Sequence, residues 1–327
     1  MTYAQASALA LTEAMEQNPA VVALGEDLGR GGSFGQYRDS MGTPLVKRFG
    51  PERIIDTPIS ENTIVGAAVG MALVGCKPVV EMRVVDFALC AVDEVVNQAA
   101  KNRFMFGGQG RVPVVLRMPI GIWSAAAAQH SQSLEAWFAH MPGLTVVTPS
   151  TPADNYGLLR AALATSDPVV YMEHKELWGM QGEVASGQAV ALGKARIARS
   201  GADLTLVSWS RQFHLCLEAA AQLESQGVHA EVIDLRTIWP WDKATVLQSA
   251  RKTSHLLVVH EAVQVAGFGA EIAATVAEQT DARVARLGAP RTPVGYAQVL
   301  EDEARVKVPQ IVAAANGLLA RARTRAT

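Results

Sequence analysis

The chain has 327 residues, of which 49% are hydrophobic and 18% are charged, and its formal net charge is −2. This length allows two domains of ordinary size, and a nearly neutral chain without a basic block gives no reason to expect nucleic acid as a partner. No apolar run reaches the roughly 18 residues of a membrane-spanning helix, so no membrane partner is expected.

The first part of the chain alternates between helical and extended patterns. A helix is predicted over residues 2–17, a strand over 20–24, a glycine-rich loop over 28–37 and a second helix over about 60–74. The elements expected next are strands at 79–82, 111–118, 144–147 and 169–172, helices at 87–103 and 151–164, and a small-residue loop at 121–132. Such alternation predicts a mostly parallel sheet covered by helices, with ligands near the strand ends.

The pattern weakens from about residue 174 to 193, which reads as a linker, and then resumes. In the second block we expect strands at 204–209, 230–234, 256–260 and 284–287, and helices at 212–225, 269–279 and 308–322. The predicted fold class is therefore α/β, with two mostly parallel, doubly wound domains spanning residues 1–185 and 186–327.

The cysteines indicate a reducing compartment. Cys76, Cys90 and Cys216 have no zinc-site spacing, and their odd number argues against a disulfide framework. The N-terminus lacks the basic start and apolar core of a signal peptide, and it is not an Arg-rich transit sequence. A cytoplasmic location is expected.

One acidic residue begins the helix predicted near residue 60. Glu61 lies in the first turn of an otherwise apolar, small-residue segment. A carboxyl group there is partly desolvated and is well placed to share a proton with a bound heteroaromatic ring. The alternative is structural, because acidic residues in first helical turns complement the helix dipole, and the local pattern alone favours that role.

Common cofactor and metal motifs are missing. The glycines at 66–70 lie inside a predicted helix and those at 267–269 follow a loop, so neither segment fits a dinucleotide fingerprint. The sequence has no phosphate loop, nucleophile elbow or histidine metal spacing. The remaining candidates, Glu26, Phe87 and His130, lie near strand and helix ends; taken singly, Phe87 reads as core and His130 as a structural histidine.

Taken together, a series of motifs carries a resemblance. In the first domain these are residues 24–27 (LGED), 56–61 (DTPISE), 85–87 (VDF), 97–101 (NQAAK), 130–133 (HSQS), 142–144, 149–152 and 167–169, and in the second domain 232–237 (VIDLRT) and 260–262 (HEA). In order and spacing the chain resembles the beta subunit of the thiamine-diphosphate-dependent E1 component of 2-oxoacid dehydrogenase complexes, a transketolase-like family. Residues 105–108, 126–130, 173–175 and 182–184 are most similar to the acetoin dehydrogenase branch. Pyruvate or branched-chain 2-oxoacid dehydrogenases are the alternative branch.

The resemblance implies a pyrimidine-binding domain at 1–185, a transketolase C-terminal-like domain at 186–327, and an active site shared with an alpha subunit in an alpha2-beta2 heterotetramer. The alpha subunit would hold the diphosphate and magnesium of thiamine diphosphate. The reaction would cleave a C–C bond next to the carbonyl of acetoin or a small 2-oxoacid, and the acyl group would pass to lipoyl on an E2 acyltransferase.

The resemblance also implies roles for individual residues. Glu61 would hydrogen-bond a nitrogen of the pyrimidine ring, Phe87 would stack against that ring, and Ile59 would contact the cofactor. Glu26 would belong to an acidic network that links paired sites. His130 would line the entrance where substrate and lipoyl arm meet, and would supply a proton or a hydrogen bond during acyl transfer.

The chain departs from the family pattern at some positions. Arg83 stands where many relatives have Gln, so it is expected near the pyrimidine, where it would alter substrate charge preference or pair with Glu26 or Asp86. Residues 122–126 are bulkier than the usual glycine-rich segment, which bears on the shape of the substrate pocket. A structural potassium ion, as in some relatives, would bind near Asp167.

Two other functions are weighed against this one. A non-catalytic assembly module would keep the subunit interfaces without processing substrate, but the combined presence of Glu61, Phe87 and His130 argues against it. A nicotinamide dehydrogenase would need a glycine fingerprint that this sequence lacks.

Overall fold

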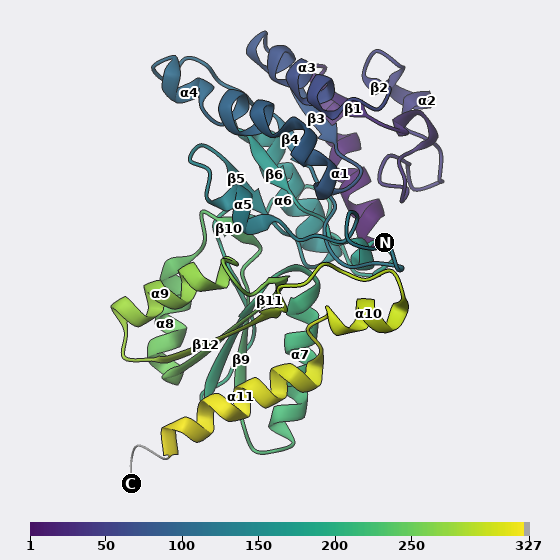
Figure 1. Ribbon diagram of the computed structural model, residues 1–327. Helices are drawn as coiled ribbons and strands as arrows, with labels where there is room; N and C mark the ends of the chain where they lie inside the picture. The colour runs from purple at the N-terminus through teal and green to yellow at the C-terminus, as the bar shows by residue number, and fades with distance from the viewer. Residues whose placement is uncertain (324–327) are drawn as a thin grey trace. The chain divides into compact units, whose positions relative to one another are not determined.

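The structure is a computed structural model that describes residues 1–323, and these residues form two compact units (Figure 1). The first unit comprises Met1–Ile120 and Trp137–Leu192. The second comprises Gly121–Ala136 and the described residues from Gly193 onward. Each unit is built around a mostly parallel sheet, which confirms the α/β class expected from the sequence.

The sheet of the first unit is parallel throughout its pairs, in the order β5-β6-β4-β3-β1-β2. Its strands are β1 (Val21–Gly25), β2 (Ile54–Asp56), β3 (Lys77–Glu81), β4 (Val115–Arg117), β5 (Thr145–Val147) and β6 (Val169–Tyr171). Every residue of β1, β4 and β6 is buried. This burial explains their near-continuous apolar sequences, because a parallel strand is covered on both faces.

The helices of this unit are α1 (Tyr3–Gln17), α2 (Val46–Phe49), α3 (Glu61–Leu73), α4 (Asn102–Met105) and α6 (Pro152–Ala164), with short 3-10 helices η1 (Leu28–Arg30) and η4 (Lys175–Leu177). Helix α5 (Glu135–Ala139) begins in the second unit and ends in the first. Helix α1 begins at a capping box in which the Thr2 hydroxyl accepts from the backbone of Gln5, and α6 begins at Thr151 followed by Pro152. Helices α1 and α6 pack against each other over one hydrophobic core (Figure 1).

The single helix expected over residues 87–103 is wrong. The structure has instead a 3-10 helix η2 (Val85–Ala91), a π-helix η3 (Glu94–Ala99) and the short α4. The side-chain amide of Asn102 donates to the carbonyl of Gln98 at 2.6 Å, and this is the carbonyl that an α-helix would pair with the backbone N–H of Asn102. A side chain that competes with the backbone in this way disfavours a continuous α-helix.

The second unit has its own sheet, in the order β12-β11-β8-β9-β7. Its elements are β7 (Arg196–Arg199), β8 (Leu204–Ser208), β9 (Ala230–Asp234), β11 (His255–Val263) and β12 (Arg283–Ala289), with α7 (Ser210–Glu224), α8 (Lys243–Thr253), α9 (Gly269–Gln279), α10 (Gln298–Glu303), α11 (Val308–Arg323) and the short strand β10 (Thr237–Trp239). Helices α7 and α11 lie side by side over a second hydrophobic core (Figure 1). Strand β7, which the sequence did not predict, pairs antiparallel with β9 at the edge.

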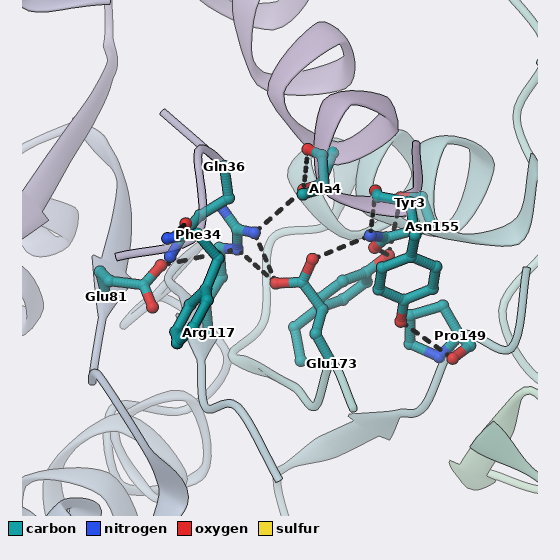
Figure 2. A network of polar contacts seen from close by, with 11 residues as sticks. Tyr3, Ala4, Phe34, Gln36, Glu81, Arg117, Pro149, Asn155 and Glu173 are labelled. Carbon is teal, nitrogen blue, oxygen red and sulfur yellow. Dashed lines mark hydrogen bonds and ion pairs between the residues drawn. The ribbon is translucent and has the colours of Figure 1, made fainter. Parts of the chain in front are cut away.

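A buried polar network ties three elements of the first unit together (Figure 2). Arg117, at the end of β4, donates from Nε to Glu173 Oε2 at 2.8 Å, and its Nη2 donates to the Ser7 hydroxyl in α1. The other Glu173 oxygen accepts from Asn155 Nδ2 in α6 at 2.8 Å. Because all of these side chains are buried, each bond replaces one that water would otherwise make.

Within residues 1–323, no helix combines the length and the apolar character needed to cross a membrane.

Candidate functional site

The predicted site residues of the first unit gather where neighbouring parallel strands end. Gly25, at the end of β1, is in register with Asp56 of β2 and with Glu81 of β3. Glu26 follows β1, and Arg83 comes two residues after β3. Ligands in α/β folds commonly bind beyond the carboxyl ends of the strands, so this edge is the candidate site.

The turn after β1 requires glycine at position 25. Its φ is +152°, and a Cβ there would lie 2.6 Å from the Glu81 carbonyl oxygen. The Gly25 carbonyl accepts from the backbone N–H of Thr57 at 3.0 Å, and Asp56 Oδ1 accepts from the Leu28 N–H at 3.1 Å. These bonds hold the turn that carries Glu26 against the turn that leads into α3.

Glu61 is the first residue of α3, and its side chain is partly buried. The Ser60 hydroxyl donates to Thr63 Oγ1 at 2.9 Å and makes no capping bond to the helix backbone. Two residues in the next turn, Ile64 and Val65, are buried and fix the helix against the sheet. Glu61, itself partly buried, therefore extends from a helix that is fixed against the sheet.

Two carboxyl groups at this edge influence each other. Burial raises the pKa of Glu26, the nearby charges of Glu61 and Asp27 raise it further, and the Arg83 guanidinium opposes them. Like charges that share a site favour the retention of one proton between them. Glu26 thus keeps its proton to a higher pH than an exposed carboxyl group would.

Arg83 makes its ion pair with Asp27, and not with the Glu26 or Asp86 partner expected from the sequence. Both residues adopt left-handed backbone conformations, with φ of 54° at Arg83 and 60° at Asp27. These turns direct the two side chains toward each other, whereas Asp86 lies buried in η2. The pairing places a neutralised cation near Glu26.

Phe87 and Ile59 flank the same region of the first unit. Phe87 is partly buried in η2, which packs against α3, the helix that begins at Glu61. Ile59 lies in the turn before α3, and 77% of it is exposed. The structure thus provides a carboxyl group, an aromatic ring and an exposed apolar side chain on adjoining elements.

His130 belongs to the second unit, within Gly121–Ala136. Its side chain is exposed, and its backbone N–H donates to the Ala127 carbonyl at 3.4 Å. Glu26, Ile59, Glu61, Arg83 and Phe87 lie in the first unit.

Asp167 has a cationic partner in the protein itself. Arg103 Nη1 donates to both carboxylate oxygens of Asp167 at 2.6 Å, and the Asp167 carbonyl accepts from the Thr165 hydroxyl at 2.9 Å. In the part of the chain that the structure describes, no group of three or more His, Cys, Asp or Glu side chains is arranged to hold a metal ion.

Asp27 and Asp56 take part in the site but were missed as site residues. Asp27 neutralises Arg83, and Asp56 fixes the turn after β1. Asp27 adjoins Glu26 in the LGED motif, so the acidic pair was visible in the sequence. Asp56 ends a strand, β2, that the sequence pattern did not reveal.

Comparison with known proteins links both units to one family. Residues 1–180 match the family described as "Transketolase, pyrimidine binding domain", and residues 193–311 match "Transketolase, C-terminal domain". The chain is similar in fold to a solved "Split gene transketolase, inactive beta4 tetramer", with a TM-score of 0.82, 22% identity and 98% coverage of each chain.

Relatives of known name cover almost the whole chain. The chain is 43% identical over 321 residues to the "Acetoin:2,6-dichlorophenolindophenol oxidoreductase subunit beta" of Cupriavidus necator, covering 94% of this chain and 95% of the relative. It is 42% identical over 324 residues to the mitochondrial "Pyruvate dehydrogenase E1 component subunit beta-2" of Oryza sativa subsp. japonica, covering 96% of this chain and 85% of the relative. These matches confirm the resemblance seen in the sequence motifs: the chain belongs to the transketolase-like family of dehydrogenase E1 beta subunits.

Proposed function

We propose that this chain is the beta subunit of a thiamine-diphosphate-dependent E1 dehydrogenase that cleaves the C–C bond next to a carbonyl of acetoin or of a small 2-oxoacid. The observation that carries the proposal is the partly buried Glu61 at the first turn of α3, electrostatically coupled to Glu26. Both residues lie in the segment that matches the pyrimidine-binding domain.

The residues at this edge fit the pyrimidine end of thiamine diphosphate. A carboxyl group suits a ring nitrogen, a flat aromatic side chain suits the ring face, and Ile59 offers apolar contact. When bound, thiamine diphosphate supplies the carbon nucleophile that attacks the substrate carbonyl. This chain would bind and orient the ring through Glu61, Phe87 and Ile59.

Glu61 would hold or share a proton at the pyrimidine ring nitrogen. Glu26, whose pKa burial and the neighbouring charge of Glu61 raise, would keep its proton to a higher pH than an exposed carboxyl group. Arg83 lowers the pKa of Glu26, and its ion pair with the Asp27 carboxylate would weaken that effect. His130 would supply a proton or a hydrogen bond during acyl transfer to the lipoyl group.

The proposed function also implies partner subunits and bound ions. An alpha subunit would hold the diphosphate and magnesium in an alpha2-beta2 heterotetramer, and an E2 acyltransferase would receive the acyl group. A potassium ion near Asp167 would have to use backbone carbonyls, because Arg103 occupies the carboxylate. Free Cys76, Cys90 and Cys216 suit a cytoplasmic location.

For the substrate we propose acetoin first, with pyruvate or a branched-chain 2-oxoacid as the alternative. The relatives named for acetoin and for pyruvate are 43% and 42% identical to this chain, so overall similarity favours acetoin only slightly. Assaying the reconstituted alpha–beta assembly with each substrate and an artificial electron acceptor separates these cases.

Replacement of Glu61 tests the function. We expect Glu61→Ala to lower turnover of the reconstituted assembly by roughly 10²–10⁴-fold, because proton transfer to the ring nitrogen is lost. Glu61→Gln should be similarly impaired, since an amide cannot carry the proton. The measurement is steady-state turnover, together with calorimetric titration of thiamine diphosphate.

The matched control is Glu271→Ala, which removes a glutamate from the first turn of another helix, α9. Both alanine variants lose a favourable interaction with a helix dipole, so a dipole role predicts equal and small effects. Wild-type turnover in Glu61→Ala would refute the proposal. A wild-type assembly that fails to bind thiamine diphosphate would favour a non-catalytic assembly module.

A further inference from the structure

The segment Gly121–Ala136, which carries His130, folds as a compact loop within the second unit. The backbone N–H of Gly121 donates to the Gln132 carbonyl at 3.0 Å and closes the loop at its base. Two turns follow inside it, with the Ala126 N–H donating to Trp123 at 3.1 Å and the His130 N–H donating to Ala127 at 3.4 Å. The position of His130 therefore depends on how this loop is held.

The backbone of the loop is strained. Ser124, Ala125 and Ala127 adopt left-handed conformations, with φ of 54°, 53° and 62°. This region is unfavourable for residues with a Cβ atom. Such conformations persist when surrounding contacts over-determine them, so the loop requires anchors outside itself.

Two buried side chains of the same unit anchor the loop near its ends. Glu261 Oε1 accepts from the backbone N–H of Ile122 at 2.7 Å, across 139 residues of sequence. At the other end, Trp209 Nε1 donates to Glu135 Oε1 at 3.0 Å. Both bonds involve a carboxylate and are buried, which makes them strong and sensitive to replacement.

The anchors stand on rigid elements. Glu261 lies in β11, which is paired on both sides by β8 and β12, and Trp209 directly follows β8. The Trp209 ring stacks on His260, with ring centroids 5.4 Å apart and an interplanar angle of 16°. His260 in turn is closely enclosed, since a Cβ at Gly267 or Gly269 would come within 2.6 or 2.8 Å of its ring.

We propose that Glu261 and Trp209 are positioning residues that hold the strained His130 loop in one conformation. The catalytic consequence rests on the function proposed above for His130, whereas the anchoring itself does not. Removal of either anchor should release the loop locally and leave the sheet of the second unit intact.

The test is hydrogen exchange of the full chain, followed by mass spectrometry of peptides covering 121–136. In Glu261→Ala we expect exchange of this segment to become roughly tenfold faster or more, because the Ile122 N–H loses a charged acceptor. Glu261→Gln keeps a side-chain carbonyl in the same place and should restore most of the protection. Peptides from β8 and β11 should exchange as in the wild type.

A second pair of variants tests the other anchor. Trp209→Phe keeps an aromatic ring against His260 but removes the N–H that donates to Glu135, and we expect faster exchange near residue 135. The matched control is Trp241→Phe, because the buried indole N–H of Trp241 makes no hydrogen bond within residues 1–323. This control should leave the exchange of the loop unchanged.

The catalytic arm uses the assembly reconstituted with its alpha subunit. We expect Glu261→Ala to lower turnover roughly tenfold, Glu261→Gln to recover most of it, and the affinity for thiamine diphosphate to stay within about twofold of wild type.

Wild-type loop exchange in both Glu261→Ala and Trp209→Phe overturns the anchoring. Faster exchange spread over the whole second unit also overturns it, because the effect would then be general destabilisation. Faster loop exchange with unchanged turnover supports the anchoring, but it contradicts the role proposed for His130 in acyl transfer.

Discussion

Among single residues, the buried glutamates of the first unit differ in how many donors face them. Glu173 accepts hydrogen bonds from both Arg117 and Asn155. Glu81, also buried, lies 3.8 Å from the Arg117 guanidinium, and the Tyr37 and Gln36 side chains are further neighbours that lower its pKa. Burial raises the pKa of Glu81 to about 7, with Arg117 opposing the shift and Glu173 adding to it.

This raised pKa predicts a pH-dependent stability. The folded state binds the Glu81 proton more tightly than the unfolded state does. Protonation of Glu81 therefore contributes fully to the stability of the fold below pH 4.5, and this contribution is lost as the pH rises through about 7. Between pH 5 and 8, the free energy of unfolding should decrease less in Glu81→Gln than in the wild type, by up to about 3 kcal/mol. Urea unfolding at several pH values measures this slope.

The control for that prediction is Glu173→Gln. Loss of this carboxylate leaves the buried Arg117 without its closest anion, so the variant should be destabilised at every pH. An unchanged pH slope in Glu81→Gln would show that Glu81 is ionised in the folded protein across the whole range.

At the scale of elements, turn glycines decide how closely segments of the first unit pack. Gly143, in the turn between α5 and β5, has a φ of +101°, and a Cβ there would lie 1.9 Å from the Ala100 carbonyl oxygen. Ala100 caps the π-helix η3. The turn and the end of this helix are therefore in backbone contact, which only a residue without a Cβ permits.

We expect Gly143→Ala to lower the free energy of unfolding by more than about 3 kcal/mol, because the overlap is with backbone that cannot move aside. Gly108→Ala is the matched control. Gly108 has a φ of +89°, and within the described residues a Cβ there would have nothing within 4 Å. Its cost should be limited to about 1 kcal/mol for the left-handed conformation. Equal losses in both variants, measured by urea unfolding, would contradict the steric argument.

At the scale of the whole molecule, the described surface contains a run of large exposed apolar side chains. Phe104 and Met105 end α4, Phe106 is its C-cap, and the three are 89%, 72% and 59% exposed. Adjacent apolar side chains at this exposure mark contact surfaces more often than scattered single ones do. Under the function proposed above, we expect this cluster to contact the alpha subunit.

Phe104→Asp should weaken assembly with the alpha subunit at least roughly tenfold, because a charge would be buried in an apolar contact. Met41→Asp is the control, since Met41 is also 89% exposed but stands in a loop of polar and small residues. Native mass spectrometry of each variant mixed with the alpha subunit measures the assembled fraction. Normal assembly of Phe104→Asp would exclude this cluster as a subunit contact.

Much of the fold and part of the site followed from the sequence. The α/β class, the buried strands and the position of Glu61 at a helix start were predicted correctly, because apolar periodicity and helix-start signals act over a few neighbouring residues. Strand β7 and helix α8 were missed. Strand β7 is an edge strand with arginine at both ends, so its pattern is weakly apolar and only pairing with β9 makes it a strand.

What the sequence determined by itself was the class of fold, the family, and the residue types available to the site. The tertiary structure alone decided that Arg83 pairs with Asp27, that the 87–103 segment departs from a regular α-helix, and that the His130 loop is anchored by Glu261 and Trp209. The physical reason is the range of the interactions. Periodicity and capping are local, whereas ion pairs and buried hydrogen bonds join residues separated by 56 to 139 positions, whose meeting depends on the folded chain.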